Sequence, residues 1–544
     1  MGATAADGPT MDESVPGDVE EAAELTAANA ATVVPAGVTG QEPAPALSAP
    51  PGASIMATVI ALGGIQALAI GFTLIRSKAV ALLLGPSGVG LFSIVDQMVG
   101  LAMQLVAFSL PFAAVKFLSA AHSAGRRAFA ELYAGFFWAL LALSGAGSLA
   151  VLLVLRLWPA LLGPELAPYG RATALAVLAI PGMVLVTLCG NAIAAAQRAR
   201  TSGGYGLLNT AALAVLPTLG VVAGGVTGYY AGALLAVAAV AACGVLYLAR
   251  SEGVLVGPPQ LGVATLRRCR GLGTFAASLY IMALALPATH LLARYTILRT
   301  SGLEAAGLLQ SAMAGGLAFA LVMRQSNALF LTPAMNRHTP AEQKFREAAE
   351  YLRSFSLVAG LVALPLVLFP EVALYVLYSR RFLSAAPYAY LFVVAQLLEV
   401  IGGVLLGILI GLDRIVAQLA ITLTGITALA VLAVTLGPRF GLAGIGVAFL
   451  ADGVLVLAVS AWLLQRQYGF NLLADCGGIP LGVLATLAAA GAWAAHAPPV
   501  WSPRLAAMKF AVLAALALAG GLLALRLHVV GGWRRPPYRL EGWR

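Results

Sequence analysis

The stretch ATALAVLAIPGMVLVTLCGNAIAAA, residues 172–196, contains no Asp, Glu, Lys, Arg or His. A transmembrane helix needs about 20 consecutive apolar residues, whereas a barrel strand crosses the bilayer with about 10 residues of alternating polarity. Because no water reaches the hydrocarbon, every backbone N–H must bond within the protein, and a continuous apolar run achieves this as a helix. The stretch therefore predicts an α-helix that crosses a membrane.

The whole chain has the same character. Of its 544 residues, 60% are hydrophobic and 10% are charged, with a mean hydropathy of +0.92. Soluble domains carry roughly 25% charged residues, and one large soluble core is excluded at this length. We expect an all-α integral membrane protein with about 14 transmembrane helices. They are placed at 55–84, 89–117, 132–155, 172–196, 204–225, 229–249, 274–298, 305–331, 354–378, 386–411, 415–436, 442–464, 478–497 and 507–526.

The charges are distributed unevenly along the chain. Residues 1–54 hold eight acids and no Lys or Arg, and their Ala-, Pro-, Gly- and Glu-rich composition predicts a disordered tail. The remaining residues carry all 32 Lys and Arg. Most of these lie in loops that are cytoplasmic if the N-terminus is inside. The positive-inside rule therefore predicts that both termini are cytoplasmic.

The chain also repeats internally at an offset of 217 residues. GVGLFS at 88–93 corresponds to AAGLLQ at 305–310, and Arg76 falls one position from the counterpart of Arg294. Both halves begin on the same side of the membrane, so the repeat is parallel and predicts two lobes around a central cavity.

Six segments follow from the spans and the repeat. We expect an acidic disordered cytoplasmic tail (1–54), a first six-helix lobe (55–250), a basic cytoplasmic linker (251–271), a second six-helix lobe (272–465), two extra transmembrane helices (466–527) and a basic cytoplasmic tail (528–544).

Ionisable side chains inside spans are costly, so each is a functional candidate. The first two spans of the two halves together hold four cations that are well placed for the interior, and only one acid lies near them. Such an excess of positive charge needs water or an anionic ligand to compensate it. The planar arginine fork suits phosphate oxygens. We predict a central cavity that binds an anionic headgroup such as a lipid diphosphate. Its expected lining residues are Arg76, Lys78, Asp96, Gln97, Arg294, Arg324, Gln325 and Asn327.

Three further residues, His290, Glu399 and Asp452, are candidates for proton or ion coupling. Instead of coupling an ion, Glu399 and Asp452 could simply hold helices together. Asp96 could likewise serve only as a structural partner of Arg76 or Arg294. The four cysteines form no CxxC, and no nucleotide-binding or metalloprotease motif is present. The sequence therefore predicts no cofactor, no metal site and no enzymatic activity.

Three stretches resemble a known family. RSKAVALLLGPSGVGLFSIVDQMVGLAMQLVAFSLPFAAVKFLSA, 76–120, places a cation, a short apolar run and an LGP-x-G-x-G turn before a second span. It resembles the opening hairpin of polysaccharide flippases, the O-antigen or Wzx-type translocases of the multidrug/oligosaccharidyl-lipid/polysaccharide (MOP) exporter superfamily. FPEVALYVLYSRRFLSAAPYAYLF, 369–392, is similar to their usual start of span 10, and GVLLGILIGLDRIVAQLA, 403–420, to the hairpin that follows. The likeness covers 55–465.

The resemblance implies a multi-pass protein of the bacterial inner membrane that flips an undecaprenyl-diphosphate-linked oligosaccharide for O-antigen, lipopolysaccharide or other surface polysaccharide biosynthesis. Related lipid II flippases place a span-1 arginine in the cavity, and Arg76 occupies the matching position. The expected partners are the lipid-linked oligosaccharide, membrane lipids and a glycan polymerase machinery, with no nucleic acid. The acidic tail and the two extra spans leave the exact branch open.

Two other functions remain open. A multidrug or cation antiporter of the same superfamily would bind cations through buried carboxylates, which the cationic excess opposes. A membrane glycan polymerase or acyltransferase would need a long periplasmic loop or an intramembrane His/Asp pair, and neither is found in the sequence.

Overall fold

The computed structural model describes residues 53–158, 163–254, 272–327, 331, 335, 340–412, 414–496 and 503–529. Nearly all of the expected tails and of the expected linker lies outside these residues, although α2 begins at Ala53 and α18 ends at Val529. The described part consists of helices and short connections, and it contains no strand. This confirms the all-α fold class.

The helices follow one another along the chain with short connections. They are α2 (Ala53–Ala107), α3 (Leu110–Ala124), α4 (Arg126–Leu157), α5 (Gly163–Leu166), the 3-10 helix η2 (Ala167–Tyr169), α6 (Gly170–Leu178), α7 (Ile180–Ala195), α8 (Ala199–Ser251), α10 (Leu272–Ser326), α12 (Ala341–Leu368), α13 (Pro370–Leu377), the 3-10 helix η4 (Arg380–Ala385), α14 (Ala386–Gly411), α15 (Ile415–Tyr468), α16 (Leu472–Asp475), α17 (Ile479–His496) and α18 (Pro503–Val529).

Ten helical segments of the described chain are long and apolar enough to cross a membrane. Four of them, α2, α8, α10 and α15, are 53 to 55 residues long. A straight helix of that length would measure about 80 Å, more than twice the ~30 Å of hydrocarbon. Each of these four therefore supplies two crossings, and the described chain has the 14 crossings expected from the sequence.

Glycine makes the four turns possible. Gly85, Gly225, Gly302 and Gly441 have φ of 68°, 57°, 80° and 58°, where a side chain would be strained. Gly85 and Gly302 are 217 residues apart, the offset found in the sequence. Each half of the chain thus begins with the same helical hairpin.

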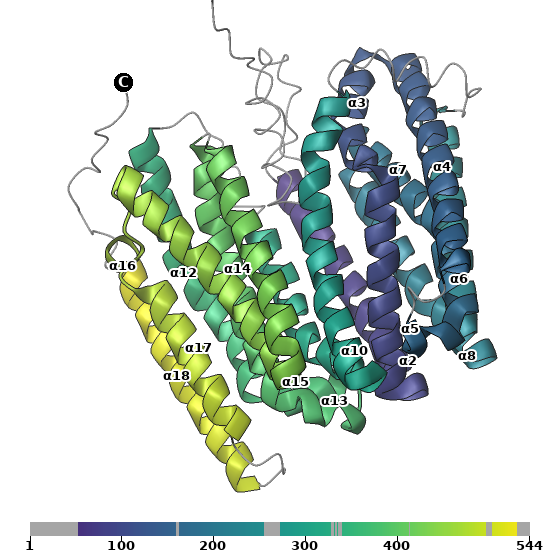
Figure 1. Cartoon of the computed structure of the whole chain (residues 1–544). Helices are drawn as coiled ribbons and strands as arrows, with labels where there is room; N and C mark the ends of the chain where they lie inside the picture. Colours follow the sequence, from purple (N-terminus) through teal and green to yellow (C-terminus); the bar gives the residue numbers. More distant parts are fainter. Residues whose placement is uncertain are drawn as a thin grey trace, which may run out of the picture.

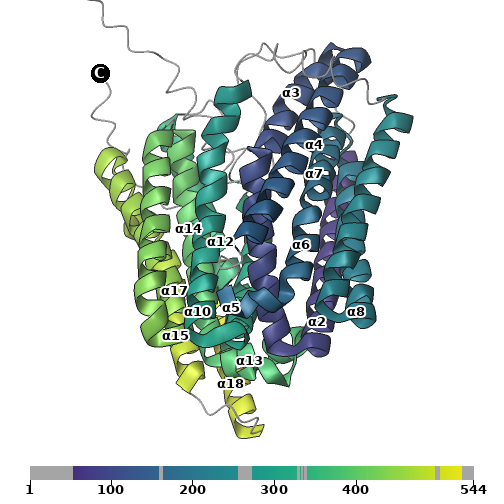
Figure 2. The same cartoon turned by 45° about the vertical axis from the view of Figure 1, so that its right-hand side comes forward.

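The helices form two groups (Figures 1 and 2). α2 to α8 gather on one side and α12 to α18 on the other, with α10 between them. α10 packs against α14 and α15 of its own half and makes an extensive contact with α2, which we call the seam. α17 packs on α12 and α14, and α18 packs on α12, so the two extra helices lie on the outer side of the second lobe.

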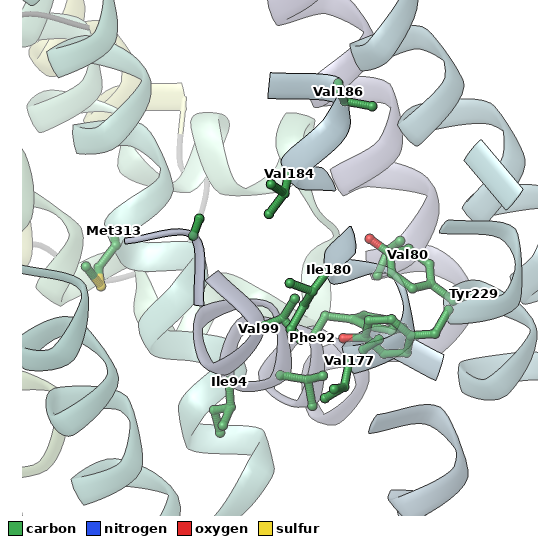
Figure 3. Close-up of a cluster of buried hydrophobic side chains, with 14 of the residues drawn as sticks. Val80, Phe92, Ile94, Val99, Val177, Ile180, Val184, Val186, Tyr229 and Met313 are labelled. Carbon is green, nitrogen blue, oxygen red and sulfur yellow. The ribbon is translucent and has the colours of Figure 1, made fainter. Parts of the chain in front are cut away.

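A buried apolar cluster fills the first lobe and reaches the seam (Figure 3). It includes Phe92 and Ile94 of α2, Ile180 of α7 and Tyr229 of α8. Met313 of α10 belongs to the same cluster, so apolar contacts hold the second lobe against the first. A second cluster unites α12, α14, α15 and α17.

The lobes approach backbone to backbone close to the turns at Gly85 and Gly302. A Cβ on Gly90 would lie 2.0 Å from the carbonyl oxygen of Leu303, and a Cβ on Gly307 would lie 1.9 Å from that of Pro86. Gly90 and Gly307 are again 217 residues apart. This end of the seam, with α13 beside it at the bottom of Figure 1, is called the hairpin end below.

Candidate functional site

The structure brings Arg76, Asp96 and Arg294 together at the seam, and we call these three residues the seam site. Asp96 lies in the second half of α2 and its side chain is exposed. Tyr230 of α8 donates a hydrogen bond of 3.0 Å to its Oδ1. Arg76 and Arg294 both interact electrostatically with this carboxylate. One acid therefore interacts with a cation of the first lobe and a cation of the second, without a direct ion pair to either among the described residues.

Arg294 is buried, with 5% of its surface exposed. Its Nη2 donates to Oε1 of Gln310 at 2.9 Å and its Nη1 to the carbonyl of His290 at 3.3 Å. Its buried Nε has no hydrogen-bond partner in the described part of the chain. A guanidinium carries five donors, and leaving a buried one unsatisfied costs free energy. Arg294 thus holds unused capacity for an anionic partner.

Arg76 has an aromatic environment. Besides Asp96, its neighbours include the phenols of Tyr229, Tyr230 and Tyr378. The first two belong to α8, and Tyr378 follows α13 in the second lobe. Arg76 therefore lies near groups from both lobes.

Two of the predicted cavity residues make contacts of a different kind. Gln97 donates a hydrogen bond of 3.0 Å to the carbonyl of Pro287, which links α2 to α10 along the seam. Lys78 donates to the carbonyl of Tyr375 at 2.6 Å, and its ammonium lies 5.3 Å from the centre of the Tyr375 ring. Lys78 therefore contacts α13 at the hairpin end.

Arg324 belongs to a second charged cluster, at the far end of α10. It forms an ion pair with Glu399 of α14, and Gln396 donates a hydrogen bond of 2.8 Å to the same carboxylate. Asp452 of α15 lies close enough to interact electrostatically with Glu399. A Cβ on Gly425 would lie 2.4 Å from Asp452 Oδ1, so that glycine makes room for the carboxylate. We call Arg324, Glu399 and Asp452 the acidic cluster.

The remaining predicted residues lie near these two groups. The ring of His290 packs 5.2 Å from that of Phe449, and His290 interacts electrostatically with both Arg294 and Arg324. Asn327 accepts a hydrogen bond of 2.6 Å from Tyr351. Gln325 lies in α10, and its side chain is outside the described part of the structure.

Tyr230 and Gln310 at the seam site and Tyr375 at the hairpin end are not among the residues predicted from the sequence. A tyrosine within a span looks like any other large apolar residue in the sequence. Its spacing does not show which group its hydroxyl bonds to. The Tyr229–Tyr230 pair lies just after the turn at Gly225. This position is the feature of the sequence that could have pointed to Tyr230. Among the described residues, no group of three or more His, Cys, Asp and Glu side chains is arranged to hold a metal ion.

Solved transporter structures share this fold. The lipid II flippase MurJ, in an inward closed conformation, is similar with a TM-score of 0.61 at 11% identity, covering 87% of this chain and 100% of that chain. An inward-facing multidrug resistance MATE family transporter of the MOP superfamily has a TM-score of 0.58 at 14% identity, covering 73% and 94%. No protein-family model matches the sequence, and neither does any curated protein. At such identities the similarity shows that this chain shares the all-α membrane fold of these proteins, and its function must be argued from the site.

Proposed function

We propose that this protein flips a lipid-linked oligosaccharide across the bacterial inner membrane and binds its diphosphate at the seam site. The observation that carries the proposal is Arg294, a buried guanidinium with an unpartnered Nε. Arg76 approaches the same carboxylate from the other lobe. Two arginines that share one acid have a net positive charge, and a diphosphate supplies the missing negative charge through the oxygens that arginine binds best.

Alternating access gives each residue a role. Arg76 and Arg294 hold the diphosphate while the lobes close around it, and Asp96 is their counter-ion when the site is empty. Because the three residues come from both lobes, their spacing changes when the lobes move, and the affinity for an anion changes with it. Glu399 of α14, Asp452 of α15 and His290 of α10 are the groups through which an ion would couple to this movement.

The rival function is a multidrug or cation antiporter. In its favour, Glu399 and Asp452 supply two neighbouring carboxylates inside the membrane. Against it, Arg324 already forms an ion pair with Glu399, so a cation would have to displace a guanidinium. The share of this chain covered also favours the flippase, since the match to MurJ extends over 87% of the chain and the match to the multidrug transporter over 73%.

The proposal is tested with purified protein in proteoliposomes that contain a fluorescent undecaprenyl-diphosphate oligosaccharide. Arg76→Ala is expected to slow flipping by about ten- to a hundredfold, because a hydrogen bond to a charged group contributes about 1.5–3 kcal/mol. The control is Arg439→Ala, an exposed arginine near the turn at Gly441, which should flip at the unmodified rate. Unchanged flipping by Arg76→Ala would exclude the seam site. Export of an organic cation without any flipping would favour the antiporter.

The orientation is tested separately with reporter fusions. Pro340 precedes α12 and Phe440 precedes the turn at Gly441, so an odd number of crossings separates them. With cytoplasmic termini, we expect a fusion at residue 340 to report the cytoplasm and one at residue 440 the periplasm. The reverse pattern would place both termini outside.

A further inference from the structure

The short helix α13 lies at the hairpin end and is held by a different element at each of its two ends. At its start, both carboxylate oxygens of Glu371 accept hydrogen bonds from Lys509 of α18, at 3.0 and 3.2 Å. The two side chains are 14% and 5% exposed. The rings of Phe369 and Phe510 pack beside them with centroids 4.7 Å apart. The outermost helix of the second lobe is thus anchored to α13 through a buried ion pair.

At its other end, α13 is held by the first lobe. Tyr375 lies in the last turn of α13, which ends at Leu377, and the last four carbonyls of a helix have no partner within it. The Lys78 ammonium donates to the Tyr375 carbonyl, where the helix dipole also favours a cation. A lysine of the first lobe therefore caps a helix of the second.

α13 has only eight residues, and an isolated helix of that length is marginal even in a favourable sequence. Its position therefore depends on its anchors. Glu371 and Tyr375 are four residues apart, so one turn of helix connects the α18 anchor to the seam anchor. A buried ion pair adds little stability over an apolar pair of the same volume, but it fixes one register.

We propose that α13 transmits the position of α18 to the seam, so that the Lys509–Glu371 pair stabilises the state in which the hairpin end is closed. Lys509 acts here as a positioning residue, because it does not touch the seam site. The proposal needs the lobes to move, as the proposed function does, but it is independent of what is transported.

Spin labels at the two hairpin turns test the proposal directly. Ser87 follows the turn at Gly85 and Ser301 precedes the turn at Gly302, and both are exposed. Cysteines are introduced at these two positions after the four native cysteines are replaced, and the distance distribution is measured by double electron–electron resonance in nanodiscs without substrate. Lys509→Gln is expected to add a population at longer distance. The swapped pair Lys509→Glu with Glu371→Lys should return the distribution to that of the unmodified protein.

The control is Arg504→Gln, an exposed cation in the first turn of the same helix, which should leave the distribution unchanged. An unchanged distribution in folded Lys509→Gln would overturn the proposal. If Lys509→Gln does not fold, the swapped pair decides, since a folded swapped pair with a shifted distribution overturns it as well. Because no substrate is present, the result does not depend on whether the protein flips a lipid diphosphate.

Discussion

Gly307→Val is expected to slow transport by about 5- to 150-fold. A Cβ at this position would lie 1.9 Å from the carbonyl oxygen of Pro86, and Cβ atoms essentially never come within 3.0 Å of such an atom. The obstacle is backbone, which cannot rotate away as a side chain can, so the two helices must separate. Overpacking costs about 1–3 kcal/mol and shifts a two-state balance by about 5- to 150-fold. Because the obstacle lies only where the hairpin end is closed, we expect the open state to accumulate.

The matched control is Gly315→Val in the same helix, where a Cβ would meet no other atom within 4 Å. This variant should keep transport, because it makes the same chemical change without the contact. Gly90→Val should reproduce the effect of Gly307→Val, since its Cβ would lie 2.0 Å from the Leu303 carbonyl oxygen. Each variant is assayed for its flipping rate and for the distance between labels at residues 87 and 301. Normal flipping by Gly307→Val would mean that the lobes do not close at this contact.

The spans and the repeat were predictable because each depends on local pattern. A run such as 172–196 satisfies its backbone hydrogen bonds in a membrane as helix, and in the structure it forms most of α6 and all of α7. Gly85 and Gly302 occupy the same place in two copies of one hairpin. The functional glycines were less obvious. Glycine is abundant throughout the chain, with 60 residues, so the 217-residue repeat pairs Gly90 with Gly307 but does not reveal the backbone contact that sets them apart from Gly100 or Gly315.

Arg76 and Lys78 make different contacts in the structure. Arg76 and Lys78 were assigned to one cavity, yet residues two positions apart do not share a helix face. In the structure Arg76 acts on Asp96, whereas Lys78 contacts Tyr375. The direction in which each side chain leaves a helix follows from the 3.6-residue period, so this difference could have been predicted from the sequence.

The partner of Arg324 could not be predicted from the sequence. Arg324 and Glu399 are 75 residues apart on different helices, and nothing local relates them. Their ion pair also balances the charge of one of the four cations that are uncompensated in the sequence. The unbalanced charge is therefore smaller than the sequence implied, and Arg294 becomes the main basis for an anion site.

Arg294→Met is expected to slow flipping by about ten- to a hundredfold or more while leaving the protein at least as thermostable. The two effects separate because a buried charge is costly to keep. Arg294 is 5% exposed with an unpartnered Nε and forms no ion pair within 4 Å in the described residues, so its removal ends the cost of a desolvated charge while Asp96 keeps Arg76 as its counter-ion. A residue retained at such a cost has a use other than stability. The melting temperature and the flipping rate are measured on the same preparation.

Arg353→Met is the opposite case and serves as the control. Arg353 donates two hydrogen bonds to the carbonyl of Asp475 at the end of α16, far along the chain from the seam site. Removing them leaves that carbonyl without these donors, so this variant should melt at a lower temperature and flip normally while folded. If Arg294→Met instead lowers the melting temperature as Arg353→Met does, with flipping unchanged in the folded fraction, Arg294 is a structural residue. In that case the carboxylate of Asp96 lies at the seam to balance Arg76 and Arg294, and the anion belongs elsewhere.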